Sequence, residues 1–402
     1  MKIQTDNWKS FRLKDIAVIS TGSTPPTKNR ENFGDEYGFA TPGDICGTRF
    51  IKKTAIKLSN KGIIKTRLAR EGSVLFVCIG STIGKVAQIA EAMAYNQQIN
   101  ACTAKEGVDQ SFFYYALLNC SSMVRRMAGT QAVPIVNKST FQHIQINLPP
   151  IAEQRKIAEI LSAQDRVIEL KTKLLEEKKR LKKYLCQVLI SGESQSEGKK
   201  ILFKELFEFL NNNSCSRAQM KEKGTIYNVH YGDILTKYGE LLDAKKDEVP
   251  CICVNINLSK YDRLQNGDIV FADTAEDLLV GKSTELKNVG NKHIIAGLHT
   301  IAARPIKDCF IPGWLGYYTN SPSYRRQLYT CAQGSKVISI LRKDIIDTIV
   351  DVPDKTIQKK VVTVLDIISD EIKKIRIVIE QEKLKKKALM QQLLTGKVRV
   401  SV

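Results

Sequence analysis

The chain has 402 residues, enough for two or three domains that each bury a core of their own. Hydrophobic residues make up 43% of it and charged residues 26%, as in ordinary globular proteins. No apolar run approaches the ~18 residues of a membrane span, and the first ten residues lack a signal peptide's apolar stretch, so we expect a cytoplasmic protein with no membrane association.

Charge is the most informative feature of the composition. The chain carries 62 Lys and Arg against 42 Asp and Glu, a net charge of +20. The surplus is +9 in residues 1–150, +4 in 151–192, +1 in 193–353 and +6 in 354–402. A surplus of this size favours a polyanionic partner through counterion release. The ten cysteines and four histidines form no spacing typical of a zinc site, so we expect no bound metal.

In chain order, the sequence predicts a globule, a long helix, a second globule and a second long helix. Residues 1–150 and 193–352 contain short apolar runs between Gly, Asn and Pro turns, which indicates mixed α/β domains. Residues 151–192 and 353–402 are the predicted helical segments. Each has a proline at its start, and a glycine (Gly192 or Gly396) follows its apolar periodicity, the usual start and stop signals of a helix.

Each predicted helix carries an apolar row at alternating steps of three and four residues, the pattern of a coiled-coil seam. In the first helix the row is Val167, Leu170, Leu174, Leu181, Tyr184 and Val188, with Glu177 in one position. In the second it is Ile368, Ile372, Ile375, Ile379, Leu389 and Leu393, with Glu382 and Lys386 in two positions. About forty residues make a rod of roughly 60 Å. A lone helix would leave this row in water, so we expect the helices to pair; the alternative is that each packs on its own domain.

The two halves of the chain repeat each other at an offset of 204 residues. LPPIAEQRKIAEIL (148–161) matches VPDKTIQKKVVTVL (352–365), and LKKYLCQVLISG (181–192) matches KKKALMQQLLTG (385–396) without a gap. The globules match weakly, through Tyr114-Tyr115 with Arg125-Arg126 and through Tyr317-Tyr318 with Arg325-Arg326. A constant offset over two helices with divergent globules indicates one scaffold that carries two different recognition domains.

These motifs resemble those of the specificity subunits of Type I restriction–modification systems. The phrase LPPIAEQRKI that opens a helix closing on LISG resembles the central conserved region of that family, and KKKALMQQLLTGKVRV resembles the C-terminal one. IAVISTGSTPP (16–26), CIGSTIGKVA (78–87) and Asn96-Gln97 are similar to features of its target-recognition domains. The second half departs from the pattern, since Ile357 stands at the position of Glu153 and ADTAEDLLVGKST (272–284) replaces the compact GSTIGK loop.

The resemblance implies an α+β fold: two mixed α/β target-recognition domains, 1–150 and 193–352, joined by two long helices that form an antiparallel coiled coil. In such a pair, Glu177 is expected near Lys383 or Lys386. The implied function is to read a bipartite, non-palindromic site in double-stranded DNA. Two methyltransferase subunits would dock near the coil and use S-adenosylmethionine, and restriction subunits would use ATP and Mg. This chain would itself bind no cofactor and catalyse nothing.

Side chains that donate or accept hydrogen bonds can read base edges, and basic ones can hold phosphates. In the first domain the predicted DNA-binding residues are Arg49, Lys52, Lys53, Ser81, Thr82, Lys85, Asn96, Gln97, Gln98, Gln131 and Lys138. In the second they are Arg217, Tyr231, Lys237, Tyr238, Lys282, His299, Ser335 and Lys336.

Two other classes of function are open to a chain of this composition. An enzyme is disfavoured, because Gly281-Lys282-Ser283-Thr284 lacks the leading glycine of a phosphate-binding loop and has Glu276 in its place. Asp354 and Glu371 have the spacing of some nuclease metal sites, but lie about 25 Å apart along one predicted helix. A coiled-coil scaffold, or a solitary DNA-binding protein without restriction partners, is the remaining alternative.

Overall fold

The computed structural model describes all residues except 1–6, 130–132, 192–197, 255, 335–336 and 402. The chain divides into two compact units. Unit 1 comprises residues 1–173 and 376–402, and unit 2 comprises residues 174–375. The division between the two units falls inside both long helices. It therefore does not test the predicted segment boundaries at 150, 192 and 352, which stay predictions. No helix in the described part of the chain is long and apolar enough to cross a membrane.

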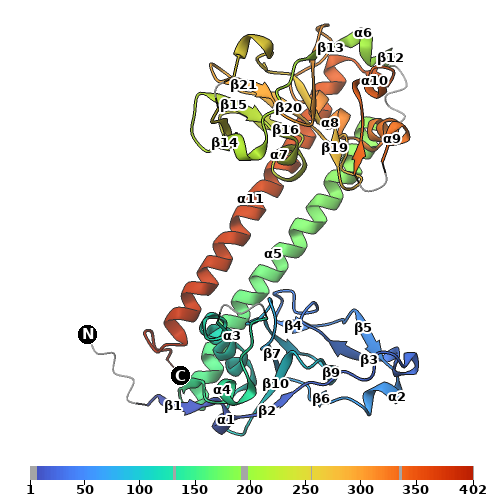
Figure 1. The fold of residues 1–402 in the computed structure, drawn as a ribbon. Helices are drawn as coiled ribbons and strands as arrows, with labels where there is room; N and C mark the ends of the chain where they lie inside the picture. The colour runs from blue at the N-terminus through green and yellow to red at the C-terminus, as the bar shows by residue number, and fades with distance from the viewer. Residues whose placement is uncertain (1–6, 130–132, 192–197, 255, 335–336, 402) are drawn as a thin grey trace. The chain divides into compact units, whose positions relative to one another are not determined.

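The β-rich part of unit 1, here called head 1, has two packed sheets with a helical layer on the larger one (Figure 1). The five-stranded sheet runs in the order β2 (Ala17–Thr21), β10 (Ile99–Ala104), β7 (Val74–Val77), β8 (Val86–Ile89) and β4 (Phe50–Ile51). The four-stranded sheet runs β5 (Ile56–Leu58), β3 (Phe33–Ala40), β9 (Met93–Tyr95) and β6 (Leu68–Ala69), and β1 (Lys9–Arg12) pairs with β11 (Gln145–Leu148). The helices are α1 (Leu13–Ile16), α2 (Asn60–Ile63), α3 (Gln110–Met127) and α4 (Lys138–Gln142), with a 3-10 turn at Arg30–Asn32.

The β-rich part of unit 2, here called head 2, repeats the five-stranded sheet strand for strand. Its order is β13 (Phe207–Leu210), β22 (Thr300–Pro305), β18 (Ile269–Ala272), β20 (Ser283–Lys287) and β16 (Leu241–Asp243). The four-stranded sheet is β14 (Met220–Lys221), β17 (Cys251–Ile252), β15 (Ile226–Val229) and β21 (His293–Ala296), and the two-stranded ones are β12 (Lys199–Leu202) with β24 (Ile349–Val352) and β19 (Thr274–Ala275) with β23 (Ile338–Ser339). The helices are α6 (Phe203–Leu206), α7 (Tyr231–Thr236), α8 (Trp314–Thr319), α9 (Pro322–Cys331) and α10 (Arg342–Ile345), with 3-10 turns at Arg217–Gln219 and Leu258–Lys260.

The two long helices are α5 (Ile151–Ser191) and α11 (Lys355–Leu393), and their first residues differ by the 204 residues of the sequence repeat. The glutamine three residues after each start is buried and holds the turn before its helix. Gln154 donates to the Pro149 carbonyl at 2.9 Å, and Gln358 donates to the Pro353 carbonyl at the same distance. A glutamine at the same position therefore holds the turn before both helices, and this shared residue is part of the repeat in the sequence.

Portions of α5 and α11 pair within each unit. In unit 1 they run in opposite directions, because Glu153 at the start of α5 bonds to Arg399 just after α11, whereas Gln164 further along α5 bonds to Glu382 within α11. In unit 1, Gln164 donates to Glu382 at 2.8 Å and Asp165 pairs with Lys386. In unit 2, Lys178 pairs with Glu371 at 2.7 Å. The expectation for Glu177 was wrong, because its carboxylate instead pairs with Arg180 on the same helix.

The predicted seam is correct for α11 and wrong for α5. Ile368, Ile372 and Ile379 of α11 are buried. On α5, however, Leu174 is 46% exposed and Tyr184 is 61% exposed, and the other predicted apolar positions are exposed as well. The row that packs against α11 lies about one residue further along α5 and includes Leu161, Gln164 and Leu175. Hydrophobicity alone selected the wrong row because the real one contains polar residues with partners on α11.

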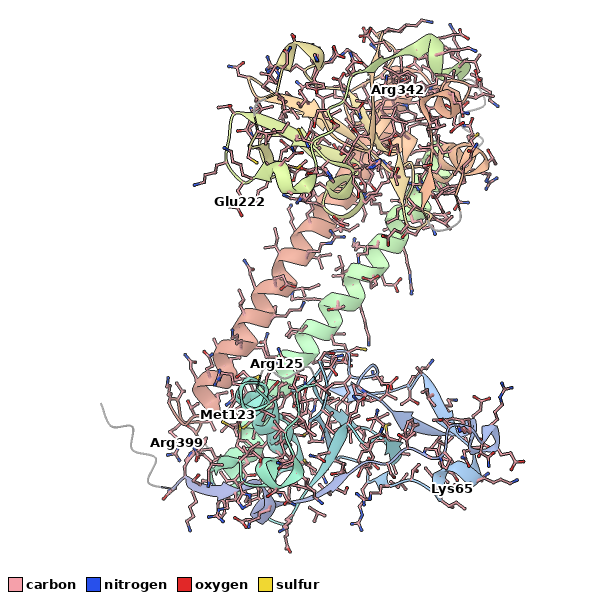
Figure 2. The ribbon with its side chains drawn as sticks, in the orientation of Figure 1. Lys65, Met123, Arg125, Glu222, Arg342 and Arg399 are labelled. Atoms are coloured by element: carbon pink, nitrogen blue, oxygen red, sulfur yellow. The ribbon has the colours of Figure 1, made fainter. Side chains whose placement is uncertain are left out.

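A short tail after α11 completes the core of unit 1. Leu393 and Leu394 are buried there, and Val400 packs against the same cluster. Arg399, labelled in Figure 2, donates to both carboxylate oxygens of Glu153, at 2.7 and 2.8 Å. Glu153 is almost fully buried on the first turn of α5. The tail is thus a structural part of unit 1.

Candidate nucleic-acid interface

Three loops of head 1 meet at one edge of its five-stranded sheet. Strands β2 and β7 end there and β8 and β10 begin there, as the pairings Thr21 with Asn100 and Val77 with Ile99 show. Backbone bonds join the loops: Cys78 N–H donates to the Gln98 carbonyl at 2.8 Å. We call residues 22–26, 78–85 and 96–98 the loop edge of head 1. Antiparallel strand order is what brings these distant segments together.

Six predicted DNA-binding residues lie on the loop edge of head 1 with exposed or half-buried side chains: Ser81, Thr82, Lys85, Asn96, Gln97 and Gln98. Asn96 bonds to both the side chain and the backbone of Gln98, and Thr24 donates to the Gln97 amide oxygen. These amides therefore sit in a fixed arrangement, with further donors and acceptors available to a ligand.

The other predicted residues of head 1 lie elsewhere or have internal partners. Arg49 donates to Gln88, Ser111 and Ser162, and so joins the sheet to α3 and α5. Lys52 lies 3.7 Å from Glu169 of α5, and Lys53 is exposed beside it. Although Lys85 lies on the loop edge, its amine donates to the Pro42 carbonyl. Lys138 is exposed at the start of α4, and Gln131 lies outside the described residues.

The structure also brings basic residues to this edge that sequence reasoning missed. Arg67 donates to the Thr21 carbonyl at 2.6 Å, and its backbone N–H donates to Ser23. Lys28 is exposed on the continuation of the loop that begins at Gly22. The signal was present as the basic run KTRLAR (65–70), but only the pairing of distant segments places it beside the loop edge.

Head 2 forms the equivalent loop edge from residues 211–216, 273–282 and 297–299. The pairings Leu210 with Ala302 and Ala272 with Thr300 define it. The Asp273 N–H donates to the His299 carbonyl, as Cys78 does to Gln98 in head 1. The two glycine loops differ in length and in side chains, as the sequence indicates, but the same backbone bond closes both of them. Gly281 donates to Ala272 at 2.8 Å as Gly84 does to Val77 at 2.9 Å, and both glycines have the positive φ that this turn requires.

Four predicted residues of head 2 lie in or beside this edge: Arg217, Tyr231, Lys282 and His299. His299 adopts a φ of 55° and its ring packs edge-on against Tyr231, with centroids 5.3 Å apart. Arg217 is largely exposed and pairs with the buried Asp233 at 2.6 Å. Lys237 donates to the Glu248 carbonyl. Ser335 and Lys336 lie outside the described residues.

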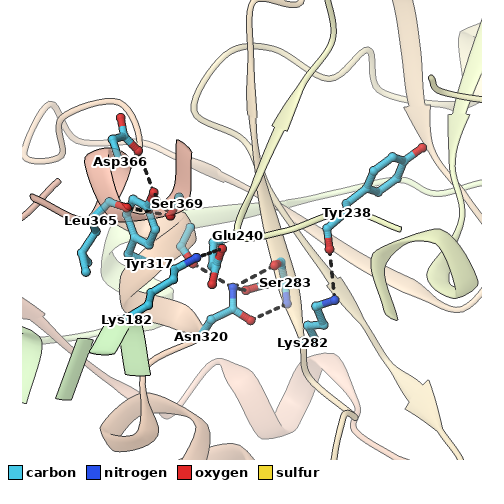
Figure 3. Close-up of polar contacts among 11 residues, drawn as sticks. Lys182, Tyr238, Glu240, Lys282, Ser283, Tyr317, Asn320, Leu365, Asp366 and Ser369 are labelled. Carbon is cyan, nitrogen blue, oxygen red and sulfur yellow. Dashed lines mark hydrogen bonds and ion pairs between the residues drawn. The ribbon is translucent and has the colours of Figure 1, made fainter. Parts of the chain in front are cut away.

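Two of the predictions for head 2 need correction. Tyr238 is 3% exposed and packs in the core between the sheets, so it belongs to the core and not to a DNA-contacting surface. Burial also raises the pKa of its phenol. The Lys282 amine donates to the Tyr238 carbonyl (Figure 3) and also to the Leu235 carbonyl. Burial lowers the pKa of this amine. Lys282 therefore holds the turn below the loop edge, as Lys85 does in head 1.

Several known proteins resemble this chain in sequence and in fold. Residues 5–180 match the family described as the Type I restriction modification DNA specificity domain. The Type I restriction enzyme MjaVIII specificity subunit of Methanocaldococcus jannaschii is 24% identical over 98% of this chain and 94% of its own length. The chain is thus similar to a Type I restriction enzyme specificity subunit over nearly its whole length, and residues 5–180 match the DNA specificity domain of that family.

Other known proteins also resemble this chain. The MjaIX specificity subunit of the same organism is 30% identical, but the match covers 43% of this chain and only 41% of that protein. Two solved structures share the fold. A chain from a study of complex assembly in the type I R-M system has a TM-score of 0.62, 16% identity and coverage of 98% and 99%. The S subunit from M. genitalium has a TM-score of 0.56, 15% identity and coverage of 98% of both chains.

A similar polar arrangement in the two units fixes each head to the long helices. Tyr115 donates to Asp165 at 2.6 Å in unit 1, and Tyr317 donates to Asp366 at 2.6 Å in unit 2. A lysine lies over each ring: Lys386 over Tyr115 and its repeat counterpart Lys182 over Tyr317. In unit 2, Lys182 pairs with Glu240 at 2.7 Å (Figure 3). Burial by itself would raise the pKa of the Glu240 carboxyl. The Lys182 amine beside it has the larger effect, so the pKa of Glu240 is lowered.

We expect Lys182→Ala to lower the free energy of unfolding of unit 2 by about 2 kcal/mol, because it leaves the Glu240 carboxylate partly buried without its cation. Lys204→Ala is the matched control, since its pair with Asp347 has a similar length of 3.0 Å but is exposed. The control should change the stability by less than about 1 kcal/mol. Urea unfolding of both variants measures the difference, and equal losses would contradict the expectation.

Proposed function

We propose that this chain directs a Type I restriction–modification complex to its DNA, each head reading one half of a bipartite, non-palindromic site. The observation that supports this is the repeated loop edge. Both heads present three loops from the same sheet positions, yet the side chains differ: Gln98 in head 1 stands where His299 stands in head 2. Equivalent scaffolds with different donors and acceptors suit two unlike half-sites.

The helices would set the distance between the half-sites and bind two methyltransferase subunits. The exposed apolar row of α5 supports a docking role, since Leu181 is 41% exposed and Val188 42% exposed on the helix surface. In this proposal S-adenosylmethionine belongs to the methyltransferase subunits, and ATP and Mg belong to restriction subunits. The specificity subunit itself would act in the cytoplasm, without catalysis and without a cofactor.

Shortening the helices tests their role as a spacer. Residues 171–177 and 372–378 lie between the Asp165–Lys386 and Lys178–Glu371 contacts, so deleting both removes one heptad from each helix. Seven residues are about 10 Å of helix, or about three base pairs at 3.4 Å each. We expect methylome sequencing to show both half-sites unchanged and the unspecified gap shorter by about three base pairs. A changed half-site with an unchanged gap would contradict the proposal.

DNA binding separates the proposal from its alternatives. The isolated subunit should bind DNA weakly and lose affinity steeply with salt, because much of its charge lies outside the heads. Adding the methyltransferase subunits should produce tight, sequence-specific binding in a gel-shift assay. Full specificity without them would indicate a solitary DNA-binding protein. No specificity in their presence would favour a coiled-coil scaffold.

A further inference from the structure

The loop edge of head 2 displays a leucine where head 1 displays a serine. Counting back three residues from the equivalent glycines, Gly84 and Gly281, gives Ser81 in head 1 and Leu278 in head 2. Leu278 is 68% exposed and the adjacent Leu279 is 43% exposed, so both stand on the outside of the loop 273–282. The position that offers a hydroxyl group in one head therefore offers an apolar surface in the other.

This loop is held rigidly from below. Arg325 of α9 is 8% exposed and donates to the carbonyls of Leu278 and Val280, at 2.6 and 2.9 Å. Tyr329 donates to the Leu278 carbonyl as well, at 2.6 Å. In head 1, the repeat counterpart Arg125 donates to the Ile83 carbonyl of the equivalent loop. An arginine thus bonds to the backbone of this loop in both heads, and in head 2 that arginine is buried. The leucine side chain is therefore presented at little entropic cost on binding.

The charges around Leu278 indicate which part of DNA it meets. Glu276 and Asp277 are exposed on the same loop, and phosphates would repel them. Carboxylates can instead accept hydrogen bonds from base amino groups in the major groove. The apolar group that base edges offer in that groove is the C5 methyl of thymine. An acidic, leucine-tipped loop therefore fits base edges better than the DNA backbone.

We propose that Leu278 reads a thymine methyl group in the half-site bound by head 2. The inference rests on the proposed function, and it assigns different chemistry to the two heads. Head 1 reads at this position with the hydroxyl of Ser81, and head 2 reads with an apolar contact. Burying one methyl group contributes about a fourfold difference in affinity, the equivalent of ~0.8 kcal/mol.

Removal of the methyl group from DNA tests the contact directly. The complex of this chain with its methyltransferase subunits is titrated with its site, in which each thymine is replaced singly by deoxyuridine. Wild-type complex should lose about fourfold in affinity at one thymine. Leu278→Ala should bind the thymine site about fourfold more weakly and should show no further loss with deoxyuridine at that position. This non-additivity is the signature of a direct contact.

A matched control is Ile306→Ala, because Ile306 is 54% exposed but follows β22 at the opposite edge of the same sheet. Its binding should equal that of the wild type on every DNA. Additive losses at every thymine, or a site without thymine, would overturn the inference. A loss in Leu278→Ala that is equal for all DNAs and tracks weaker methyltransferase binding would assign the leucine to a protein contact. If the wild-type complex binds no specific site, the proposed function itself fails.

Discussion

Arg399→Ala should lower the free energy of unfolding of unit 1 by about 3 kcal/mol, because it leaves a buried carboxylate without its cationic partner. Glu153 is 2% exposed, and both of its oxygens accept from the Arg399 guanidinium. A charge held in this way is costly to leave without its partner, since water cannot replace the lost hydrogen bonds. Hydrogen exchange of unit 1 amides is the appropriate measurement, because two compact units need not unfold in one transition.

The repeat itself supplies a rescue variant for this prediction. Ile357 stands at the position of Glu153 in the second copy, so an apolar residue is compatible with this turn of the helix. The double variant Glu153→Ile with Arg399→Leu should recover most of the lost stability, because removing both charges removes the desolvation penalty. Lys156→Ala breaks an exposed pair with Glu159 on the same helix and should cost less than about 1 kcal/mol. A double variant no more stable than Arg399→Ala would contradict this explanation.

Unit 2 should become less stable as the pH rises from about 4.5 to 7, through the titration of Glu285. This carboxyl is 1% exposed on β20 and accepts from the Gly313 and Gly316 N–H groups, at 2.6 and 2.8 Å. Burial outweighs these hydrogen bonds and raises the pKa of Glu285 to about 7. The folded state therefore keeps a proton that the unfolded state has released. The contribution of protonated Glu285 to the free energy of unfolding is full below pH 4.5 and is lost as the pH passes 7. The change amounts to about 3 kcal/mol.

Glu285→Gln isolates this effect. Gln88 occupies the equivalent position of β8 in head 1, so an amide is compatible with this site in the sheet. The amide has one acceptor oxygen for two N–H donors, which should lower stability by the same amount at every pH. Urea unfolding of unit 2 between pH 4.5 and 8 should show a smaller decline in the variant than in the wild type. Parallel pH profiles for the two proteins would show that Glu285 is not responsible.

The helices were predictable because their signals are local. A proline before each start, a glutamine that holds the turn and a terminal glycine act within a few residues of one another. The repeat of these signals at one offset predicted helical segments at 151–192 and 353–402, and the structure begins α5 at Ile151 and α11 at Lys355. The residues of the loop edges were partly predictable for the same reason, since Ser81, Gln97 and His299 lie in polar loops between apolar runs.

Packing decided what local signals could not. Val167, Leu170 and Leu174 belong to the more apolar row of α5, but these side chains are exposed. The row one residue further on faces α11, because Gln164 donates a hydrogen bond to Glu382 there. An apolar periodicity identifies the rows that are able to pack, whereas the choice between them depends on partners distant in sequence. Tyr238 illustrates the same limit, since a tyrosine near polar residues in the chain lies in the core once the two sheets of head 2 close over it.

The sequence by itself determined the duplicated plan of the chain, the two long helices and the resemblance to Type I specificity subunits, because these depend on short-range signals repeated at a fixed spacing. Only the tertiary structure decided which polar residues are free to meet DNA. Arg49, Lys85 and Lys282 bond to groups within their own unit, and Arg67, which the sequence did not single out, bonds to the Thr21 carbonyl beside the loop edge. A side chain's availability depends on donors and acceptors that strand pairing brings beside it, and those come from segments far apart in the chain.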